Sequence, residues 1–153
     1  MTISDTRVEI LESSHRQYLL EHFMGLSESD RQFRFCSCMK STVEDYLSKI
    51  DFTRDRVLGA WNGDSVLVGV GHLYFLEKHK VAYICLSVDS HFRGLGYGQI
   101  LIEHAKKITR ACCYPKLKIL CSNLNTPIIS LASKSGFCMV SCKDSEWEGA
   151  LTF

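Results

Sequence analysis

The most informative segment of the chain reads Leu86-Ser87-Val88-Asp89-Ser90-His91-Phe92-Arg93-Gly94-Leu95-Gly96-Tyr97-Gly98-Gln99. It joins a strand-like apolar run to residues whose apolar positions recur at helical spacing. Its glycines let the backbone turn tightly and approach a ligand without a Cβ atom in the way. N–H groups at a helix start lack intrahelical partners, and the helix dipole favours an anion there. The segment predicts a phosphate or pyrophosphate cradle; a glycine turn that binds nothing is the alternative.

The spacing of these glycines excludes the two common nucleotide-binding motifs. A dinucleotide fingerprint, G-x-G-x-x-G, counted from Gly94 and Gly96 would put its third glycine at Gln99. The acid expected about 20 residues further on is replaced by Lys118. A P-loop needs Gly-Lys-Ser/Thr after the glycines, and Gly98-Gln99-Ile100 does not supply it.

The composition favours a globular protein that works without nucleic acid or membrane. Hydrophobic residues make up 46% and charged residues 23% of the 153 residues, and the net charge is +1. No apolar run approaches the roughly 20 residues of a membrane helix. The first seven residues lack an apolar signal core, so we expect a cytoplasmic location.

The eight cysteines form no C-x-x-C pair, and only one residue separates Cys36 from Cys38. A structural zinc site needs closely spaced ligand pairs, so we expect no metal. Cys85 and Cys121 lie in apolar, strand-like runs, which predicts small buried hydrophobic side chains in a reducing compartment.

The hydrophobic period predicts a single α/β (α+β) domain over residues 1–153, with early antiparallel hairpins and a later βαβ crossover. Asn62-Gly63-Asp64 predicts a hairpin turn, because Asn and Gly tolerate positive φ. Strands are predicted at 8–11, 57–61, 65–76, 81–88, 116–121, 138–142 and 147–153. Helices are predicted at 14–24 with Ser14 as N-cap, at 28–36, after a capping box at 41–44, between the glycine loop and Pro115, and from Asn125 to Lys134 with Gly136 as left-handed terminus.

Two motifs in register resemble the GNAT N-acetyltransferase superfamily. Arg93-Gly94-Leu95-Gly96-Tyr97-Gly98 resembles the acetyl-CoA pyrophosphate loop of that family, Arg/Gln-x-x-Gly-x-Gly/Ala. Residues 125–137 resemble its later Asn…Leu…Lys-x-Gly-Phe segment, and the order of elements agrees over essentially the whole chain. Within the superfamily, residues 31–35, 50–55 and 125–137 look closest to the acetyltransferase domain of bacterial protein-lysine acetyltransferases.

The resemblance implies a mixed, mostly antiparallel central sheet that is flanked by helices and splayed at the acetyl-CoA site. It implies that the backbone of Leu86, Ser87 and Val88 binds the pantetheine arm and that Asn125 contacts the cofactor near its thiol. As a helix N-cap, Asn125 also has a purely structural reading. Arg93 would help shape the loop, whose N–H groups would bind the pyrophosphate from Gly94, Leu95, Gly96, Tyr97, Gly98 and Gln99.

The implied reaction moves an acetyl group to a primary amine by direct attack in a ternary complex. The acceptor is either a protein lysine or a small-molecule amine, and the resemblance does not decide between them. A homodimer is a possible assembly. An acyl-CoA-binding module or sensor with little turnover is the alternative.

The usual acid and base positions of the family lack their usual residues. Many relatives have a tyrosine seven residues after the asparagine, where this chain has Ala132. The glutamate that many have on the strand before the glycine loop corresponds to Ala82 or Tyr83, and the glutamate that others have five residues before the asparagine corresponds to Leu120. We expect a tyrosine at position 132 to restore a proton donor beside the thiolate. His72 and Tyr83 are candidate catalytic residues, although each could instead have a purely structural role. Alternatively, the reaction proceeds by proximity and desolvation, with water as the proton carrier.

Overall fold

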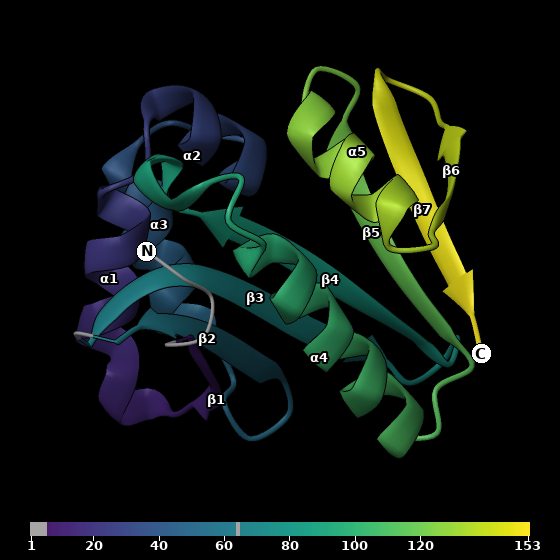
Figure 1. Ribbon diagram of the computed structural model, residues 1–153, viewed down its shortest axis with the longest axis horizontal. Helices are drawn as coiled ribbons and strands as arrows, with labels where there is room; N and C mark the ends of the chain where they lie inside the picture. Colours follow the sequence, from purple (N-terminus) through teal and green to yellow (C-terminus); the bar gives the residue numbers. More distant parts are fainter. Residues whose placement is uncertain (1–5, 64) are drawn as a thin grey trace.

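The computed structural model describes residues 6–63 and 65–153, so Asp64 of the predicted hairpin turn lies outside the described residues. A seven-stranded sheet has the order β1-β2-β3-β4-β5-β7-β6 (Figure 1). Its strands are β1 (Arg7–Leu11), β2 (Arg56–Asn62), β3 (Val66–Leu76), β4 (Val81–Val88), β5 (Lys116–Ser122), β6 (Cys138–Ser141) and β7 (Glu146–Thr152). The helices are α1 (Arg16–Met24), α2 (Glu28–Phe35), α3 (Lys40–Lys49), α4 (Tyr97–Ala111) and α5 (Thr126–Lys134), with 3-10 turns η2 (Ser13–His15) and η3 (Ser90–Phe92).

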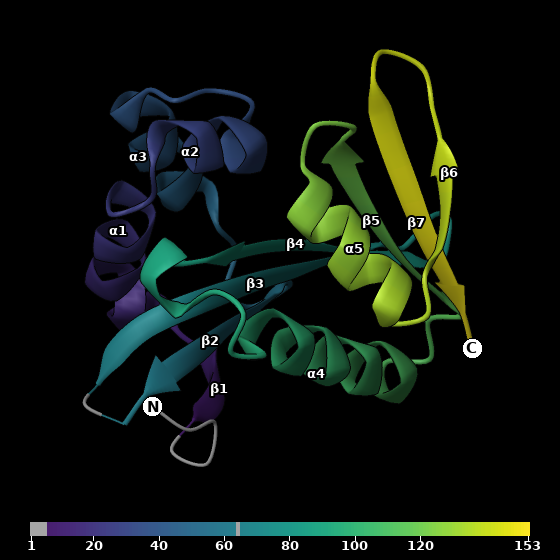
Figure 2. The same ribbon diagram turned by 45° about the horizontal axis from the view of Figure 1, so that its top comes forward.

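All strand pairs are antiparallel except β4 and β5, which are parallel and joined by α4. The pairing of β4 with β5 covers only Val81–Tyr83 against Lys116–Lys118. Beyond these residues the two strands diverge, and β5, β6 and β7 incline away from the rest of the sheet (Figure 2). The predicted mostly antiparallel, splayed sheet is therefore confirmed.

Two hydrophobic cores cover the two faces of the sheet. Because side chains alternate along a strand, β4 contributes Ala82, Ile84 and Leu86 to the core beneath α4 and α5. The other core packs α1 and α3 on β2 and β3, with Phe23 and Val43 completely buried. Tyr83, Cys85 and Ser87 alternate with the first set, so they lie on the same face as α1, α2 and α3.

Two predicted helix caps are wrong. Ser14 lies inside η2, and α1 begins only at Arg16, because Glu12 and His15 form a reciprocal capping box one turn earlier. Ser41 lies within α3, whose N-cap position is Met39. Instead, the Ser37 hydroxyl accepts hydrogen bonds from the Met39 N–H and the Thr42 hydroxyl.

The predicted end of α5 is confirmed. Gly136 has φ of +96°, and N–H groups of Gly136 and Phe137 donate to the carbonyls of Ser133 and Ala132 at 3.2 and 3.0 Å. These two bonds make a Schellman motif, which satisfies the last carbonyls of the helix.

The cysteine prediction holds only in part. Cys121 is buried and Cys85 half-buried, whereas the other six are exposed, including Cys138 on β6. Among residues 6–63 and 65–153, no helix is long and apolar enough to cross a membrane. In the same residues, no group of three or more His, Cys, Asp or Glu side chains could hold a metal ion.

Candidate functional site

A cleft of about 490 Å³ opens where β4 and β5 diverge. Its walls come from α2 on one side, α5 on the other and the start of α4 below the opening. The sequence-predicted residues that line it are Leu86, Ser87, Val88, Arg93, Gly94, Gly96, Tyr97, Gly98, Gln99 and Asn125. Leu95 is the exception: it does not line the cleft, and its side chain packs against the larger core.

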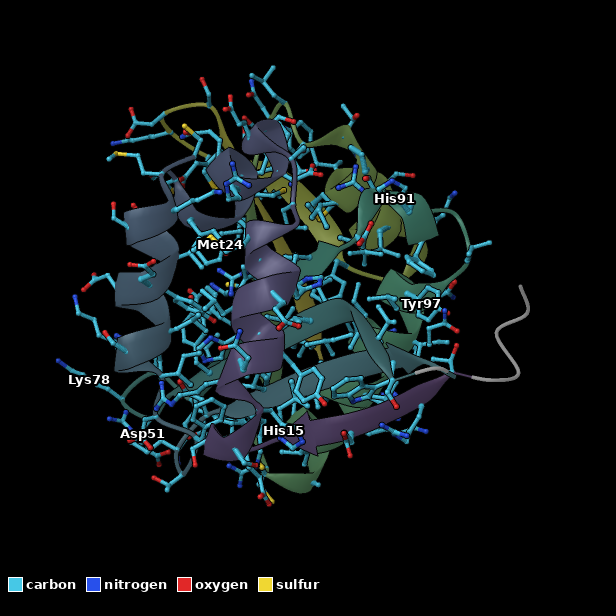
Figure 3. The ribbon with its side chains drawn as sticks, turned by 90° about the vertical axis from the view of Figure 1, so that its left-hand side faces the viewer. His15, Met24, Asp51, Lys78, His91 and Tyr97 are labelled. Atoms are coloured by element: carbon cyan, nitrogen blue, oxygen red, sulfur yellow. The ribbon has the colours of Figure 1, made fainter. Side chains whose placement is uncertain are left out.

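The start of α4 presents free backbone donors to this cleft. Gly96 is its N-cap with φ of +94°, and the N–H of Ile100 makes the first intrahelical bond, 3.0 Å from the Gly96 carbonyl. The N–H groups of Tyr97, Gly98 and Gln99 therefore have no partner within the helix. Figure 3 shows His91 and Tyr97 at the edge of the molecule where the loop leads into this helix. A 15-residue helix with free donors at its start fits a pyrophosphate.

Neighbouring elements hold the glycine loop in place. The Arg93 guanidinium pairs with the Asp30 carboxylate of α2 at 2.7 Å. On the other side, a Cβ atom on Gly98 would come within 2.7 Å of the Leu131 side chain of α5. Glycine at position 98 thus allows α4 and α5 to approach closely.

The edge of β4 continues the site from the loop toward the opening. β5 pairs with β4 only up to Tyr83, so it leaves unpaired the backbone groups of Leu86–Val88 that face it. An extended ligand can bind such an edge as an additional strand does. This edge therefore suits the amide groups of a pantetheine arm.

Asn125 occupies the N-cap position of α5, but its side chain makes no capping hydrogen bond. The structural reading of Asn125 as a side-chain cap is therefore wrong. Asn125 lines the cleft just beyond the end of β5.

Ser87 is bound by a histidine that the sequence analysis did not single out. Its hydroxyl lies 2.8 Å from Nε2 of His22, whose Nδ1 lies 3.3 Å from the Leu67 carbonyl. A carbonyl only accepts, so Nδ1 donates and Nε2 accepts the Ser87 proton. Burial lowers the pKa of His22 to about 4, which keeps the imidazole neutral near pH 7.

His72 is not among the residues that line the cleft, and its role as a base stays a prediction. Its Nε2 lies 2.8 Å from the Asp55 carboxylate, and its Nδ1 accepts the hydroxyl proton of Tyr46. The Tyr46 oxygen in turn accepts a 2.8 Å hydrogen bond from Nη2 of Arg34. Burial lowers the pKa of His72 despite Asp55, so the ring stays neutral. Both ring nitrogens are engaged, and of this chain of side chains only Arg34 lines the cleft.

Tyr83 also lies outside the lining of the cleft. Its ring stacks on Tyr74 of β3, with centroids 5.5 Å apart and an interplanar angle of 11°. This cross-strand pair explains a tyrosine at position 83 without a catalytic role.

Ala132 is completely buried in the larger core and does not line the cleft. A tyrosine at this position would have to displace core side chains, so we no longer expect that Ala132→Tyr simply restores a proton donor. Overpacking of this kind costs about 1–3 kcal/mol of stability.

Several lining residues escaped the sequence analysis. Asp30, Phe33 and Arg34 come from α2, where mixed charge looks like a solvated helix surface. Phe33 and Arg34 lie in the same helix as Arg31 and Phe35, which do not line the cleft. Which of these side chains reach the cleft depends on how α2 packs against the sheet. No local pattern distinguishes them.

Comparisons with known proteins agree with this geometry. A model of the Acetyltransferase (GNAT) family matches residues 20–137. Among solved structures, the chain is similar to the GNAT domain of PAT from S. lividans, with a TM-score of 0.84, 16% identity, and coverage of 97% of this chain and 90% of that one. It is also similar to PaiA N-acetyltransferase from Thermoplasma acidophilum in complex with coenzyme A (TM-score 0.76, 17% identity, 97% and 99% coverage).

A further similar structure is spermidine N-acetyltransferase from Vibrio cholerae in complex with CoA and spermine (TM-score 0.78, 14% identity, 97% and 96% coverage). At these identities the solved structures show a common fold. The family match spans more than half of the chain and includes both the glycine loop and the whole of the later motif. The chain belongs to the GNAT acetyltransferase family.

Proposed function

We propose that residues 1–153 form a single-domain, acetyl-CoA-dependent N-acetyltransferase. One observation carries this: Tyr97, Gly98 and Gln99, whose N–H groups have no partner within the helix, line a cleft that continues along an unpaired strand edge. An anion site followed by an extended, hydrogen-bonding edge suits a pyrophosphate joined to a pantetheine arm. Similar folds that hold CoA in other proteins support the assignment.

In this proposal the chain binds and orients the two reactants. The start of α4 holds the pyrophosphate, Leu86–Val88 bind the arm, and Asn125 contacts the thiol end. Acetyl-CoA supplies the thioester that a primary amine attacks directly in a ternary complex. Such positioning removes much of the entropic part of the barrier.

Deprotonation of the amine is proposed to rest on desolvation and water. A lysine-like amine has a pKa near 10.4, and an apolar wall lowers it because burial disfavours the charged form. Leu26 and Phe33 supply such a wall. Among described residues of the lining, Asp30 is the one carboxylate, and it is paired with Arg93. No direct role as a base is proposed for His72 or Tyr83.

A second candidate function is an acyl-CoA-binding module or sensor with little turnover. The observation that favours it is Ala132, a core residue at the position where the family resemblance implies a proton-donating tyrosine. Turnover separates the two: an enzyme transfers acetyl groups to some member of an amine panel, and a sensor binds acetyl-CoA without transfer.

The test combines calorimetry with acetyl-CoA and an amine panel that includes lysine peptides and small amines. Gly96→Ala is compared with Gly136→Ala, because both glycines have φ above +90° and each alanine therefore costs about 1–2 kcal/mol in backbone strain. Only Gly96 belongs to the cleft. We expect acetyl-CoA affinity to fall at least tenfold in Gly96→Ala and to persist in Gly136→Ala. Equal affinity in both folded variants would show that the loop is assigned wrongly.

A further inference from the structure

Two arginines one turn apart on α2 are used very differently. Arg31 is buried and donates to three backbone carbonyls, those of Met24, Leu26 and Cys38, so it ties together the ends of α1 and α2. Arg34 makes one hydrogen bond among the described residues, to Tyr46, although a guanidinium has five N–H donors. Its Nε is buried without a partner, and it pairs with no carboxylate of the described chain. Arg31 is therefore structural, whereas Arg34 keeps unused donors at the cleft.

The structure fixes where Arg34 stands along the cleft. Its guanidinium is held by Tyr46, which bonds to His72, and His72 pairs across the sheet with Cys85 of β4. The rings of Phe23, Phe35 and Tyr46 pack around the guanidinium carbon at 4.8–5.6 Å. Cys85 is three residues before Val88, which corresponds to about 10 Å along a strand. Through Tyr46 and His72, Arg34 is connected to the register position of Cys85, and it lies one helical turn beyond Asp30, which pairs with Arg93 of the glycine loop.

The charges of the cleft agree with an anion at this place. Its described lining contains Arg34, Arg93 and Lys134 as cations and Asp30 as carboxylate, and Asp30 is paired with Arg93. Lys134 follows Leu131 by about one helical turn, and Leu131 contacts the start of α4 at Gly98. Arg93 and Lys134 are thus placed for the cofactor phosphates. A pantetheine arm is neutral, so it leaves the charge of Arg34 unmatched.

We infer that Arg34 receives an anionic group of the acceptor, and that the acceptor is a small primary amine that carries a carboxylate or a phosphate. The inference rests on the proposed function, because it assigns the acceptor part of the same cleft. A guanidinium binds carboxylate or phosphate through two parallel hydrogen bonds. The chain from Asp55 through His72 and Tyr46 holds it in place for this contact. A polyamine finds no free carboxylate among the described residues of the lining.

The experiment uses matched amine pairs that differ only in the anionic group. β-Alanine is compared with β-alaninamide, and O-phosphoethanolamine with ethanolamine, so that the carboxylate and phosphate arms are separate. Each amine is titrated by calorimetry into the protein saturated with CoA and into the protein alone, and acetyl transfer is measured in parallel. Hydrogen bonds to charged groups predict at least tenfold tighter binding of the anionic member of one pair.

Two variants test the residue. Arg34→Gln should make the paired amines bind with nearly equal affinity, and Arg34→Lys, which keeps the charge without the planar fork, should give an intermediate preference. Arg54→Gln is the matched control, because Arg54 is exposed and lies outside the cleft. It should keep the full preference of the parent.

The outcomes distinguish this inference from the proposed function. If the parent protein binds acetyl-CoA but shows no preference in either pair, or prefers ethanolamine and spermidine, the anionic acceptor is wrong and the proposed function stands. If acetyl-CoA does not bind while the anion preference depends on Arg34, the proposed function is wrong and the anion site stands. A preference that survives Arg34→Gln and Arg34→Lys unchanged overturns the assignment to Arg34.

Discussion

His22 shows how one buried side chain makes stability depend on pH. Its pKa is about 4 in the folded protein, below the usual 6.5, because burial disfavours the imidazolium. The unfolded chain therefore binds more protons between these values, and the folded state loses stability as pH falls through that window. Above pH 6.5 both states hold a neutral ring and the effect disappears.

We expect the free energy of unfolding to fall by about 3 kcal/mol between pH 7 and pH 4 through His22. His72, whose pKa is also lowered by burial, adds to the effect in the same direction. Urea unfolding of the parent at several pH values measures the total. His22→Gln should flatten the dependence, while His79→Gln, at an exposed position, should leave it as in the parent. An unchanged slope in His22→Gln would contradict this account.

Two cysteines report occupancy of the cleft. Cys85 and Cys121 line it on opposite strands, and burial raises the pKa of the Cys121 thiol. A thiol reacts through its thiolate, so Cys121 should be alkylated slowly by iodoacetamide. Saturating acetyl-CoA should slow labelling of both residues at least severalfold, as measured by peptide mass spectrometry. Cys142 is exposed and provides the internal control, with a rate that acetyl-CoA leaves unchanged.

At the scale of elements, α2 connects the glycine loop with the part of the cleft that we propose for the acceptor. Asp30 near its start pairs with Arg93, and Arg34 near its end donates a hydrogen bond to Tyr46 of α3. One helix thus contacts both halves of the site, and its amphipathic face is turned toward the cleft through Phe33 and Arg34.

Asp30→Asn tests this link. The pair is partly exposed, so its loss should change stability by less than about 1 kcal/mol. We expect acetyl-CoA affinity to fall severalfold, because the loop loses the contact that orders it before binding. Asp45→Asn, which breaks the exposed pair with Lys49 on α3, is the matched control and should keep the affinity. Unchanged or higher affinity in Asp30→Asn would show that Arg93 does not need its partner.

At the scale of the whole molecule, the sheet consists of two halves that meet in a short parallel contact. β4 and β5 pair over Val81–Tyr83 alone, and α4 and α5 cover the region where the strands separate (Figure 2). A ligand that binds both edges should therefore stabilise the junction as well as the site.

Acetyl-CoA at a concentration of 100 times its dissociation constant should raise the free energy of unfolding by about 2.7 kcal/mol, because a ligand that binds only the folded state stabilises that state. Amide hydrogen exchange should show added protection at Ile84–Val88 and at the start of α4. The pairing of β1 with β2 lies at the far edge of the sheet and should show little change. Protection that is equal in all strands would indicate global stabilisation without a bridging role.

The order of elements, the mostly antiparallel sheet and the turn at Gly136 could all be predicted from the sequence. Each depends on local signals: the period of apolar residues, glycines that must adopt positive φ, and the spacing of one loop motif. The candidate cofactor segment at 86–99 was recognisable for the same reason, because its donors belong to consecutive backbone positions. Caps at Ser14 and Ser41 failed because competing polar groups nearby, at Glu12, His15 and Ser37, shifted the helix starts.

Only the tertiary structure decided the polar side chains of the site. Arg34, Tyr46, His72 and Asp55 join across separations of 12, 26 and 17 residues, and His22 reaches Ser87 across 65. In the same packing, His72 and Tyr83 do not line the cleft, and Ala132 is buried in the core. No local sequence pattern predicts these contacts, because a side chain on a helix or strand meets distant partners only after the elements pack. Local signals in the sequence were enough to single out the glycine loop as a candidate anion site, whereas the packing of α2 against β4 brings Arg34 into the same cleft.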